Sequence, residues 1–215
     1  MDISRRSFTK VSLGAGALLA INPSYSASEA QLIQRLIPSS GETIPVIGVG
    51  TNRFGVGNDQ NARKILKSTL KKFHELGGTI IDTAPSYGTS EIVLGELIAD
   101  LELQKDLFLA SKVDSKNLSD NKVGYSRSMQ RFNTQQFDLM QVHNFKDWQN
   151  SLTLLKDKKA AGEIRYLGMT THMPSQYELM EQAIKQQELD FIQVNLSLAN
   201  QRISGERLIP IAADH

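Results

Sequence analysis

The chain has 215 residues, of which 40% are hydrophobic and 22% charged, and this is enough apolar material to bury a core without a metal or a disulfide. Its 24 Lys and Arg nearly balance its 23 Asp and Glu, so the formal net charge of +1 gives no electrostatic reason to expect nucleic acid or an acidic membrane as a partner. The absence of cysteine excludes thiol catalysis, disulfides and cysteine-based zinc sites.

The first 28 residues have the pattern of an export signal. The pair Arg5 and Arg6 precedes Phe8, and a mild apolar run covers residues 11–21. That run is too short to cross a bilayer as a stable helix, and the small residues after it suit a signal peptidase. The segment resembles a twin-arginine signal peptide, which implies export to the periplasm by the twin-arginine machinery. The alternative is a basic tail followed by a weakly apolar stretch. We predict a signal peptide over residues 1–28 and one folded domain over residues 29–215.

Strands and helices are predicted to alternate along that domain. A short hairpin is expected around residues 39–41. The predicted strands cover residues 44–50, 79–82, 107–112, 137–143, 165–170 and 190–198. The predicted helices cover residues 59–76, 90–101, 120–132, 148–161, 174–186 and 205–215, with Ser90 as the cap of the second and Glu91 at its positive end. Such alternation implies parallel strands, and six βα units of similar length favour an α/β fold of the (β/α)8 TIM-barrel type over an open doubly wound sheet.

A closed barrel of this type needs eight strands, whereas six are counted before the chain ends in a sixth helix. We interpret the chain as incomplete at its C-terminus, or as a shortened product with two exposed strand edges.

Ionisable residues close three successive predicted strands. Asp82, Lys112 and His143 each stand where an apolar strand ends, and Tyr87 lies five residues beyond Asp82 in a loop that Pro85 and Gly88 shape. Reacting groups in such barrels come from the carboxyl ends of different strands. Each residue alone fits a turn, a solvated charge or simple packing, but the combination indicates an active site.

The loop Asp82–Gly88, Lys112 after the next strand and His143 after the one following resemble the Asp, Tyr, Lys, His tetrad of aldo-keto reductases, over roughly residues 32–215. The resemblance implies NAD(P)H-dependent reduction of an aldehyde or ketone, with Tyr87 as the proton donor. Lys112 is expected to lower the pKa of the Tyr87 phenol, and Asp82 to hold Lys112 by an ion pair. His143 is expected to donate a hydrogen bond to the carbonyl of a small-molecule substrate.

The cofactor is expected at the barrel mouth, because no Gly-x-Gly-x-x-Gly motif follows a strand and opens a helix. By the same resemblance, the nicotinamide carboxamide is assigned to Thr170, Thr171 and Gln193. Asn195 is a further candidate because it lies two residues beyond Gln193, on the same strand face, and the alternative is a polar residue that satisfies the barrel interior. Thr171 stands where the family usually has an amide. The family's habit favours NADP(H), with NAD(H) as the alternative.

Two other classes of function remain open. A catalytically silent barrel used as a binding module would fit a chain without the last two strands. A different TIM-barrel enzyme, such as a hydrolase that uses Asp82 and His143, would need a second carboxylate or a metal cluster, and no metal-spaced partner for His143 is visible in the sequence.

Overall fold

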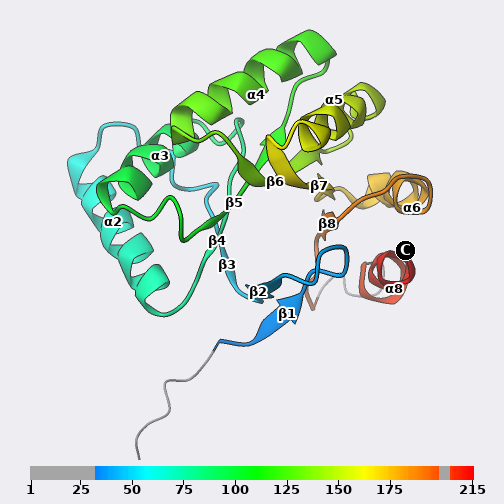
Figure 1. The fold of residues 1–215 in the computed structure, drawn as a ribbon, viewed down its shortest axis with the longest axis horizontal. Helices are drawn as coiled ribbons and strands as arrows, with labels where there is room; N and C mark the ends of the chain where they lie inside the picture. Colours follow the sequence, from blue (N-terminus) through cyan, green and yellow to red (C-terminus); the bar gives the residue numbers. More distant parts are fainter. Residues whose placement is uncertain (1–31, 199–203) are drawn as a thin grey trace, which may run out of the picture. The chain divides into compact units, whose positions relative to one another are not determined.

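Six parallel strands form one curled sheet in which they follow one another in chain order (Figure 1). The structure is a computed structural model that describes residues 32–198 and 204–215. Neighbouring strands are parallel throughout this sheet. The strands are β3 (Gly48–Gly50), β4 (Ile80–Asp82), β5 (Phe108–Val113), β6 (Phe137–His143), β7 (Ile164–Thr171) and β8 (Phe191–Val194). The predicted α/β architecture of six βα units from a (β/α)8 barrel is confirmed, with β3 and β8 as the two edge strands of this sheet.

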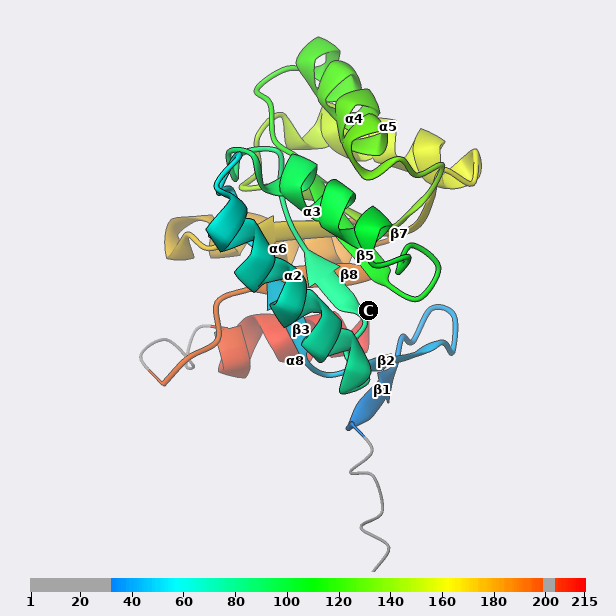
Figure 2. The ribbon, with the colours of Figure 1, turned by 90° about the vertical axis from the view of Figure 1, so that its left-hand side faces the viewer.

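Helices follow the strands and cover the outer face of the curled sheet (Figure 2). They are α2 (Gln60–Glu75), α3 (Ser90–Asp100), α4 (Leu118–Phe132), α5 (Trp148–Ala160), α6 (Tyr177–Gln186) after a 3-10 turn at Pro174–Gln176, and α8 (Ile209–Asp214) after a π-helical turn at Ser204–Leu208. None of the helices in residues 32–198 and 204–215 has the length and apolar character needed to cross a membrane. The predicted signal peptide, residues 1–28, lies outside the described residues.

Alternation along the strands separates an apolar layer from a polar one. In β6, Met140 and Val142 belong to the main core between sheet and helices, whereas Leu139 belongs to a second apolar cluster on the inner face of the curl. Successive strand residues point to opposite faces, so Gln141 and His143 share the inner face with Leu139. The inner face is therefore apolar near the amino ends of the strands and polar near their carboxyl ends.

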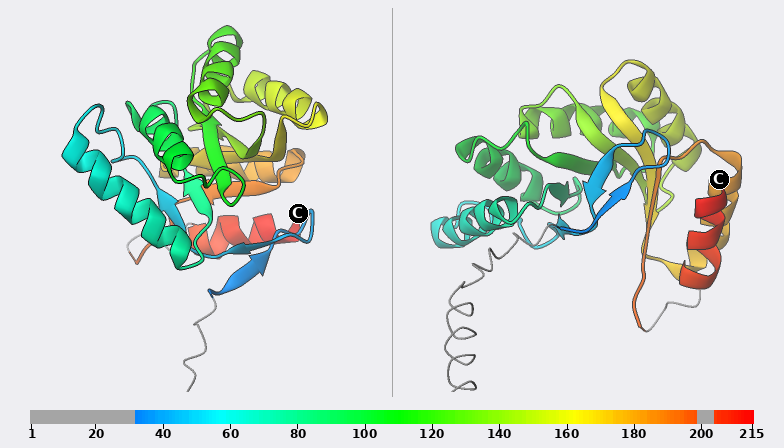
Figure 3. Two further views of the ribbon diagram at one scale, coloured as in Figure 1. Left: turned by 60° about the vertical axis from the view of Figure 1, so that its left-hand side comes forward. Right: turned by 60° about the horizontal axis from the view of Figure 1, so that its bottom comes forward.

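A hairpin packs against the apolar end of this inner face (Figure 3). Its strands β1 (Gln34–Leu36) and β2 (Thr43–Pro45) are antiparallel, as the turn signal at residues 39–41 predicted. Ile37 at its turn is buried in the inner cluster, and the Ser40 hydroxyl lies 2.7 Å from the Tyr166 hydroxyl of β7. The hairpin thus leaves the polar, carboxyl-terminal end of the strands as the place for chemistry.

The predicted first barrel strand, residues 44–50, is wrong as a single strand. Residues 44 and 45 complete the hairpin, and only Gly48–Gly50 pairs with β4 in the sheet. Pro45 has no N–H to continue a ladder, and the N–H of Val46 still bonds the carbonyl of Ile33 on the hairpin side. The chain changes sheets between these two segments.

The predicted cap of α3 is also wrong, whereas Glu91 lies in the first turn of this helix as predicted. The residue before the helix is Thr89, and Ser90 is its first residue, whose hydroxyl donates to the carbonyl of Thr51 at 3.0 Å. The Glu91 side chain is 1% exposed and bonds to β5 and α4. Tertiary partners, rather than the helix dipole, determine where both side chains lie.

Other boundaries differ from prediction by a few residues. Helix α4 begins two residues early, because the side chain of Asn117 accepts a hydrogen bond from the N–H of Asp120 at 2.9 Å and so caps it. Strand β8 ends at Val194, four residues before the predicted end.

Candidate active site

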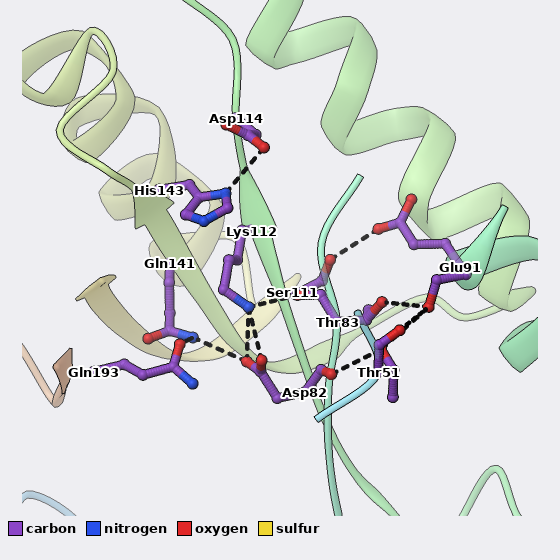
Figure 4. Close-up of polar contacts among 11 residues, drawn as sticks. Thr51, Asp82, Thr83, Glu91, Ser111, Lys112, Asp114, Gln141, His143 and Gln193 are labelled. Carbon is purple, nitrogen blue, oxygen red and sulfur yellow. Dashed lines mark hydrogen bonds and ion pairs between the residues drawn. The ribbon is translucent and has the colours of Figure 1, made fainter. Parts of the chain in front are cut away.

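The carboxyl ends of β4, β5 and β6 bring three predicted residues to one rim of the sheet (Figure 4). Asp82 is the last residue of β4, Lys112 the next to last of β5, and His143 the last of β6. The alternation of parallel strands turns all three side chains to the inner face. Sequence position alone therefore predicted their convergence correctly.

Lys112 is the most constrained of these side chains. Its side chain is 2% exposed, and its ammonium donates to Asp82 Oδ1 at 2.8 Å, to Asp82 Oδ2 at 2.9 Å and to the carbonyl of Thr83 at 2.7 Å. Burial lowers the pKa of the Lys112 ammonium, and the charge and hydrogen bonds of Asp82 oppose that effect. The expected Asp82–Lys112 ion pair is present, and it also fixes the backbone that leads to Tyr87.

Tyr87 lies above this ion pair, in the loop between β4 and α3. Lys112 Nζ is 5.4 Å from the centroid of the Tyr87 ring, and the ring meets the His143 imidazole edge-on, with 6.3 Å between centroids. Gly88, at φ +62°, lets the loop turn back after Tyr87. The four residues predicted as catalytic thus lie together.

A neighbouring loop holds the Tyr87 loop from outside. The hydroxyl of Thr51 donates to the carbonyl of Asp82 at 2.9 Å, and the N–H of Gly57 donates to the hydroxyl of Thr89 at 2.9 Å. A Cβ atom at Gly55 would lie 2.7 Å from the carbonyl oxygen of Tyr87, so a glycine is needed for this approach. The segment after edge strand β3 is joined in this way to the loop that carries Tyr87.

The predicted effect of Lys112 on Tyr87 is wrong. Burial raises the pKa of the Tyr87 phenol above its ordinary value, and the carboxylates of Asp82 and Asp114 raise it further. The Lys112 ammonium is already bonded to Asp82 and Thr83 and faces the ring of Tyr87, and no hydrogen bond joins it to the phenol within the described part of the chain. At neutral pH Tyr87 therefore keeps its proton.

Asp114, which the sequence analysis did not single out, lies beside His143 (Figure 4). Its side chain is 5% exposed, and its Oδ2 lies 2.9 Å from His143 Nδ1. The two atoms are not aligned as a hydrogen bond, and neither has another hydrogen-bond partner among the described residues. Asp114 also forms an ion pair with Lys146, in the segment after β6.

These contacts keep Asp114 ionised. Burial alone would raise the pKa of its carboxyl, but contacts with His143, Lys146 and Ser86 outweigh burial and hold the pKa well below its ordinary range. A negative charge is thereby fixed next to the imidazole.

The backbone of the rim is supported on its other face by a second buried carboxylate. Glu91 of α3 accepts hydrogen bonds from Ser111 of β5 at 2.8 Å, from Ser128 of α4 at 2.8 Å and from Arg131 of α4 at 2.7 Å. Ser111 precedes Lys112, so this cluster fixes the strand position from which Lys112 projects. The sequence analysis had assigned Glu91 only to the helix start.

Gln141 extends the inner polar group from Asp82 to Gln193. Its side chain is 1% exposed, and its Nε2 lies 3.4 Å from both Asp82 Oδ1 and Gln193 Oε1. Its Oε1 is buried and has no hydrogen-bond partner among the described residues. A buried acceptor in this position suits a polar N–H group brought by a ligand, such as the carboxamide of a nicotinamide.

Thr170 and Gln193, two of the four predicted cofactor residues, lie on this inner face. Thr170 pairs with both His143 and Gln193 across the sheet, and Gln193 reaches Gln141. The neighbouring Thr171 faces the helices, where its hydroxyl donates to Gln176 Oε1 at 2.6 Å. Asn195 follows β8 and donates to the carbonyl of His172 at 2.7 Å. In this structure Thr171 and Asn195 therefore hold the segment after β7.

Gln141 and Asp114, which the sequence analysis missed, could have been found from their positions in the sequence. Gln141 lies two residues before His143 in one strand, and Asp114 two residues after Lys112, so strand periodicity alone would have flagged both as neighbours of the predicted site. No group of three or more His, Asp or Glu side chains that could hold a metal ion occurs in the described residues.

Comparison with known proteins supports the family resemblance noted in the sequence. The model described as "Aldo/keto reductase family" matches residues 46–215. Methylglyoxal reductase YeaE of Escherichia coli K12 is 33% identical over 148 residues, which cover 64% of this chain and 49% of that protein. The NADH-specific methylglyoxal reductase of E. coli K12 is 26% identical over 207 residues, which cover 80% of this chain and 61% of that protein. The chain thus spans about half to three fifths of the length of these relatives.

Solved structures agree on the fold. An aldo-keto reductase from Pseudomonas aeruginosa superimposes with a TM-score of 0.70 at 24% identity, covering 85% of this chain and 75% of that one. An aldo/keto reductase from Klebsiella pneumoniae, in complex with NADP and acetate, superimposes with a TM-score of 0.68 at 24% identity, covering 81% and 62%. Since the family match extends over most of the described residues, the chain belongs to the aldo/keto reductase family.

Proposed function

We propose that this protein reduces an aldehyde or ketone to an alcohol with hydride from a nicotinamide cofactor. The observation that carries the proposal is the meeting of Tyr87, His143 and the buried Lys112–Asp82 ion pair at one rim of the sheet. Family membership supports a carbonyl reductase in general terms.

In the proposed reaction, Tyr87 donates its phenolic proton to the carbonyl oxygen. Its raised pKa keeps the proton in place until charge develops on that oxygen. His143 orients the carbonyl by a hydrogen bond. Lys112 fixes the loop start through Asp82 and the carbonyl of Thr83, so that the phenol returns to the same position in each turnover.

The inner face offers a place for the cofactor. When bound, a nicotinamide cofactor supplies the hydride, because no side chain can donate one. Thr170 and Gln193 are the residues we propose for its carboxamide, next to Gln141 Oε1, which has no hydrogen-bond partner in residues 32–198 and 204–215. Thr171 and Asn195 would reach it only by giving up their bonds to Gln176 and to the carbonyl of His172.

The kind of nicotinamide and the substrate are proposed from relatives. One E. coli relative is named as NADH-specific, and the K. pneumoniae structure contains NADP, so NADP(H) and NAD(H) should be tested side by side. Two relatives are named methylglyoxal reductases, and we therefore propose small 2-oxoaldehydes as the first substrate class to examine.

The test is a fluorescence titration with both reduced cofactors, followed by a turnover assay with methylglyoxal. We expect saturable binding of at least one cofactor and its consumption only when the aldehyde is present. Binding without turnover by Tyr87→Phe would support the role of the phenol, whereas unaltered turnover would remove Tyr87 from the mechanism.

A catalytically silent binding module is the second candidate. It is favoured by the two edge strands, β3 and β8, which leave the described sheet open. Absence of any fluorescence change with either cofactor would favour this candidate.

We also propose export by the twin-arginine route. The support is the sequence of residues 1–28 alone, with its paired arginines and short apolar run. Cell fractionation should recover the protein in the periplasm, and replacing Arg5 and Arg6 by lysine should retain it inside. Recovery in the cytoplasm before any substitution would contradict the proposal.

A further inference from the structure

Asp114 stands out because the proposed chemistry does not use it, although it is buried at the centre of the site. Its carboxylate faces His143 at 2.9 Å and also contacts Lys146 and Ser86. Keeping a carboxylate away from water is costly unless its charge and lone pairs are matched, so a buried one needs a reason in its surroundings.

The two facing atoms depend on each other. Asp114 Oδ2 and His143 Nδ1 are both buried, and neither has a hydrogen-bond partner elsewhere in the described residues. Buried polar groups in folded proteins are nearly always paired. A small rotation of the imidazole would align the Nδ1–H bond with the carboxylate and satisfy both atoms together.

We propose that Asp114 is a positioning residue of the active site, which holds the His143 imidazole with a proton on Nδ1 and leaves Nε2 to face the substrate. In Figure 4 the other ring nitrogen points away from Asp114. The proposal rests on the proposed reductase function for its catalytic meaning, whereas the protonation of the ring is a property of the protein alone.

The consequence for catalysis follows from the two nitrogens of the ring. A neutral imidazole with its proton on Nδ1 has only a lone pair at Nε2, which repels a carbonyl oxygen. His143 can then donate to the substrate only as the imidazolium, with both nitrogens protonated.

Other charged and titratable groups surround this pair. Lys146 offsets the charge of Asp114 from the segment after β6. Tyr87 contacts the imidazole from the loop after β4, and Lys112 lies below that phenol. Arg127 and Arg131 of α4 line, together with Asp114, a cavity of about 210 Å³ behind the pair.

Nitrogen-15 NMR of the imidazole side chains in the full, cofactor-free chain tests the proposal directly. At a pH at which the rings are neutral, we expect His143 to carry its proton on Nδ1. His74 provides an internal comparison, because its Nε2 faces Asp106 at 3.4 Å and the opposite protonation is expected there. The variant His143→Gln assigns the signal. A neutral His143 that is protonated on Nε2 would overturn the proposal.

Matched variants separate the role of Asp114 from general effects of lost charge. Asp114→Leu keeps the branched shape of the side chain but cannot accept a hydrogen bond, so His143 should revert to the Nε2–H form. Asp106→Leu should change His74 and leave His143 as it is. If Asp114→Leu does not fold, Asp114→Asn keeps the shape without the charge and should reduce the population of the Nδ1–H form. An unchanged His143 in both Asp114 variants would contradict the proposal.

The pH dependence of kcat/KM provides the catalytic readout. In the natural sequence, donation from Nε2 requires a ring that is protonated on both nitrogens, so kcat/KM should fall by roughly tenfold for each pH unit on the alkaline side of its profile. In Asp114→Leu the neutral ring still offers an Nε2–H, so that fall should be much weaker. The same profile in both proteins would exclude a positioning role. If no reductase activity is found at all, the NMR result still decides how Asp114 holds the ring, so the two proposals fail separately.

Discussion

The two faces of β5 carry buried charge in different ways. On the helix side, Glu91 accepts from Ser111, Ser128 and Arg131, and no atom of these four side chains is a buried polar atom without a partner. On the inner side, Lys112 is equally well satisfied by Asp82 and Thr83.

Several buried polar atoms near Lys112, however, have no hydrogen-bond partner among the described residues. In the described residues, the buried side-chain atoms without a hydrogen-bond partner are Asp114 Oδ2, Gln141 Oε1, His143 Nδ1, Asn144 Oδ1 and Asp147 Oδ2. Gln141 and His143 lie in the carboxyl-terminal half of β6, Asp114 and Asn144 directly follow β5 and β6, and Asp147 directly precedes α5. A cluster that only stabilises the fold completes its hydrogen bonds, whereas a site for a ligand keeps some open.

Tyr87→Phe should have the largest effect on activity. It changes the inner side of the sheet, where several buried polar atoms of the described residues lack a hydrogen-bond partner. Loss of a general acid should lower kcat by about a hundredfold to ten-thousandfold, while cofactor affinity stays nearly constant. Steady-state kinetics and a cofactor titration measure the two quantities. Tyr125→Phe, which removes a hydroxyl on α4 near the carbonyl of Glu163, is the control and should leave kcat unchanged.

Glu91→Ala tests the helix side of β5, where the hydrogen bonds of the Glu91 cluster are complete. It leaves the guanidinium of Arg131 and two buried hydroxyls without their acceptor, so the free energy of unfolding should fall by about 3 to 5 kcal/mol. Urea denaturation measures this loss. Glu96 lies on the same helix as Glu91 and is a solvent-exposed partner of Arg63 in α2. Glu96→Ala should lower the free energy of unfolding by less than about 1 kcal/mol. Equal losses in the two variants would contradict the distinction.

Asp114→Asn should have a smaller effect that depends on pH. The folded state lowers the pKa of Asp114, so its carboxylate stabilises the protein above its ordinary pKa, and this stabilisation is lost as the pH falls through the lowered folded pKa. At neutral pH the variant should be less stable by about 1 to 2 kcal/mol. Urea denaturation in increasingly acidic buffer should show the difference shrinking. A difference that grows in acid would refute the assignment.

Gln193→Ala should have the smallest effect. Removing the hydrogen bond that we propose between Gln193 and the carboxamide should weaken cofactor binding by about fivefold to tenfold, which corresponds to roughly 1 kcal/mol. Gln187→Ala, which removes an exposed contact with Lys156, is the matched control and should bind the cofactor normally. The fluorescence titration distinguishes the two variants.

The sequence was most informative where a property repeats along a strand. The boundaries of β6 were predicted to the residue, and the inner placement of Asp82, Lys112 and His143 followed from their positions at strand ends. The first barrel strand was misjudged because Pro45 ends a hairpin that looks continuous with β3 in an apolar run.

The electrostatics of the site were less predictable. The pKa of Tyr87 depends on burial and on Asp114, and a strand pattern does not report which loop will fold over which carboxylate. Glu91 likewise fitted a helix start in the sequence, whereas its partners come from β5 and α4, which lie 20 to 40 residues further along the chain.

The close contact at Gly55 couples the edge of the sheet to the Tyr87 loop. The segment that leaves edge strand β3 contacts the Tyr87 loop through Thr51, Gly55 and Gly57. A strand or ligand that paired along β3 would restrain that segment and, with it, the loop that carries Tyr87. Contacts made at this edge of the sheet and the position of the Tyr87 phenol are in this way coupled through one short stretch of backbone.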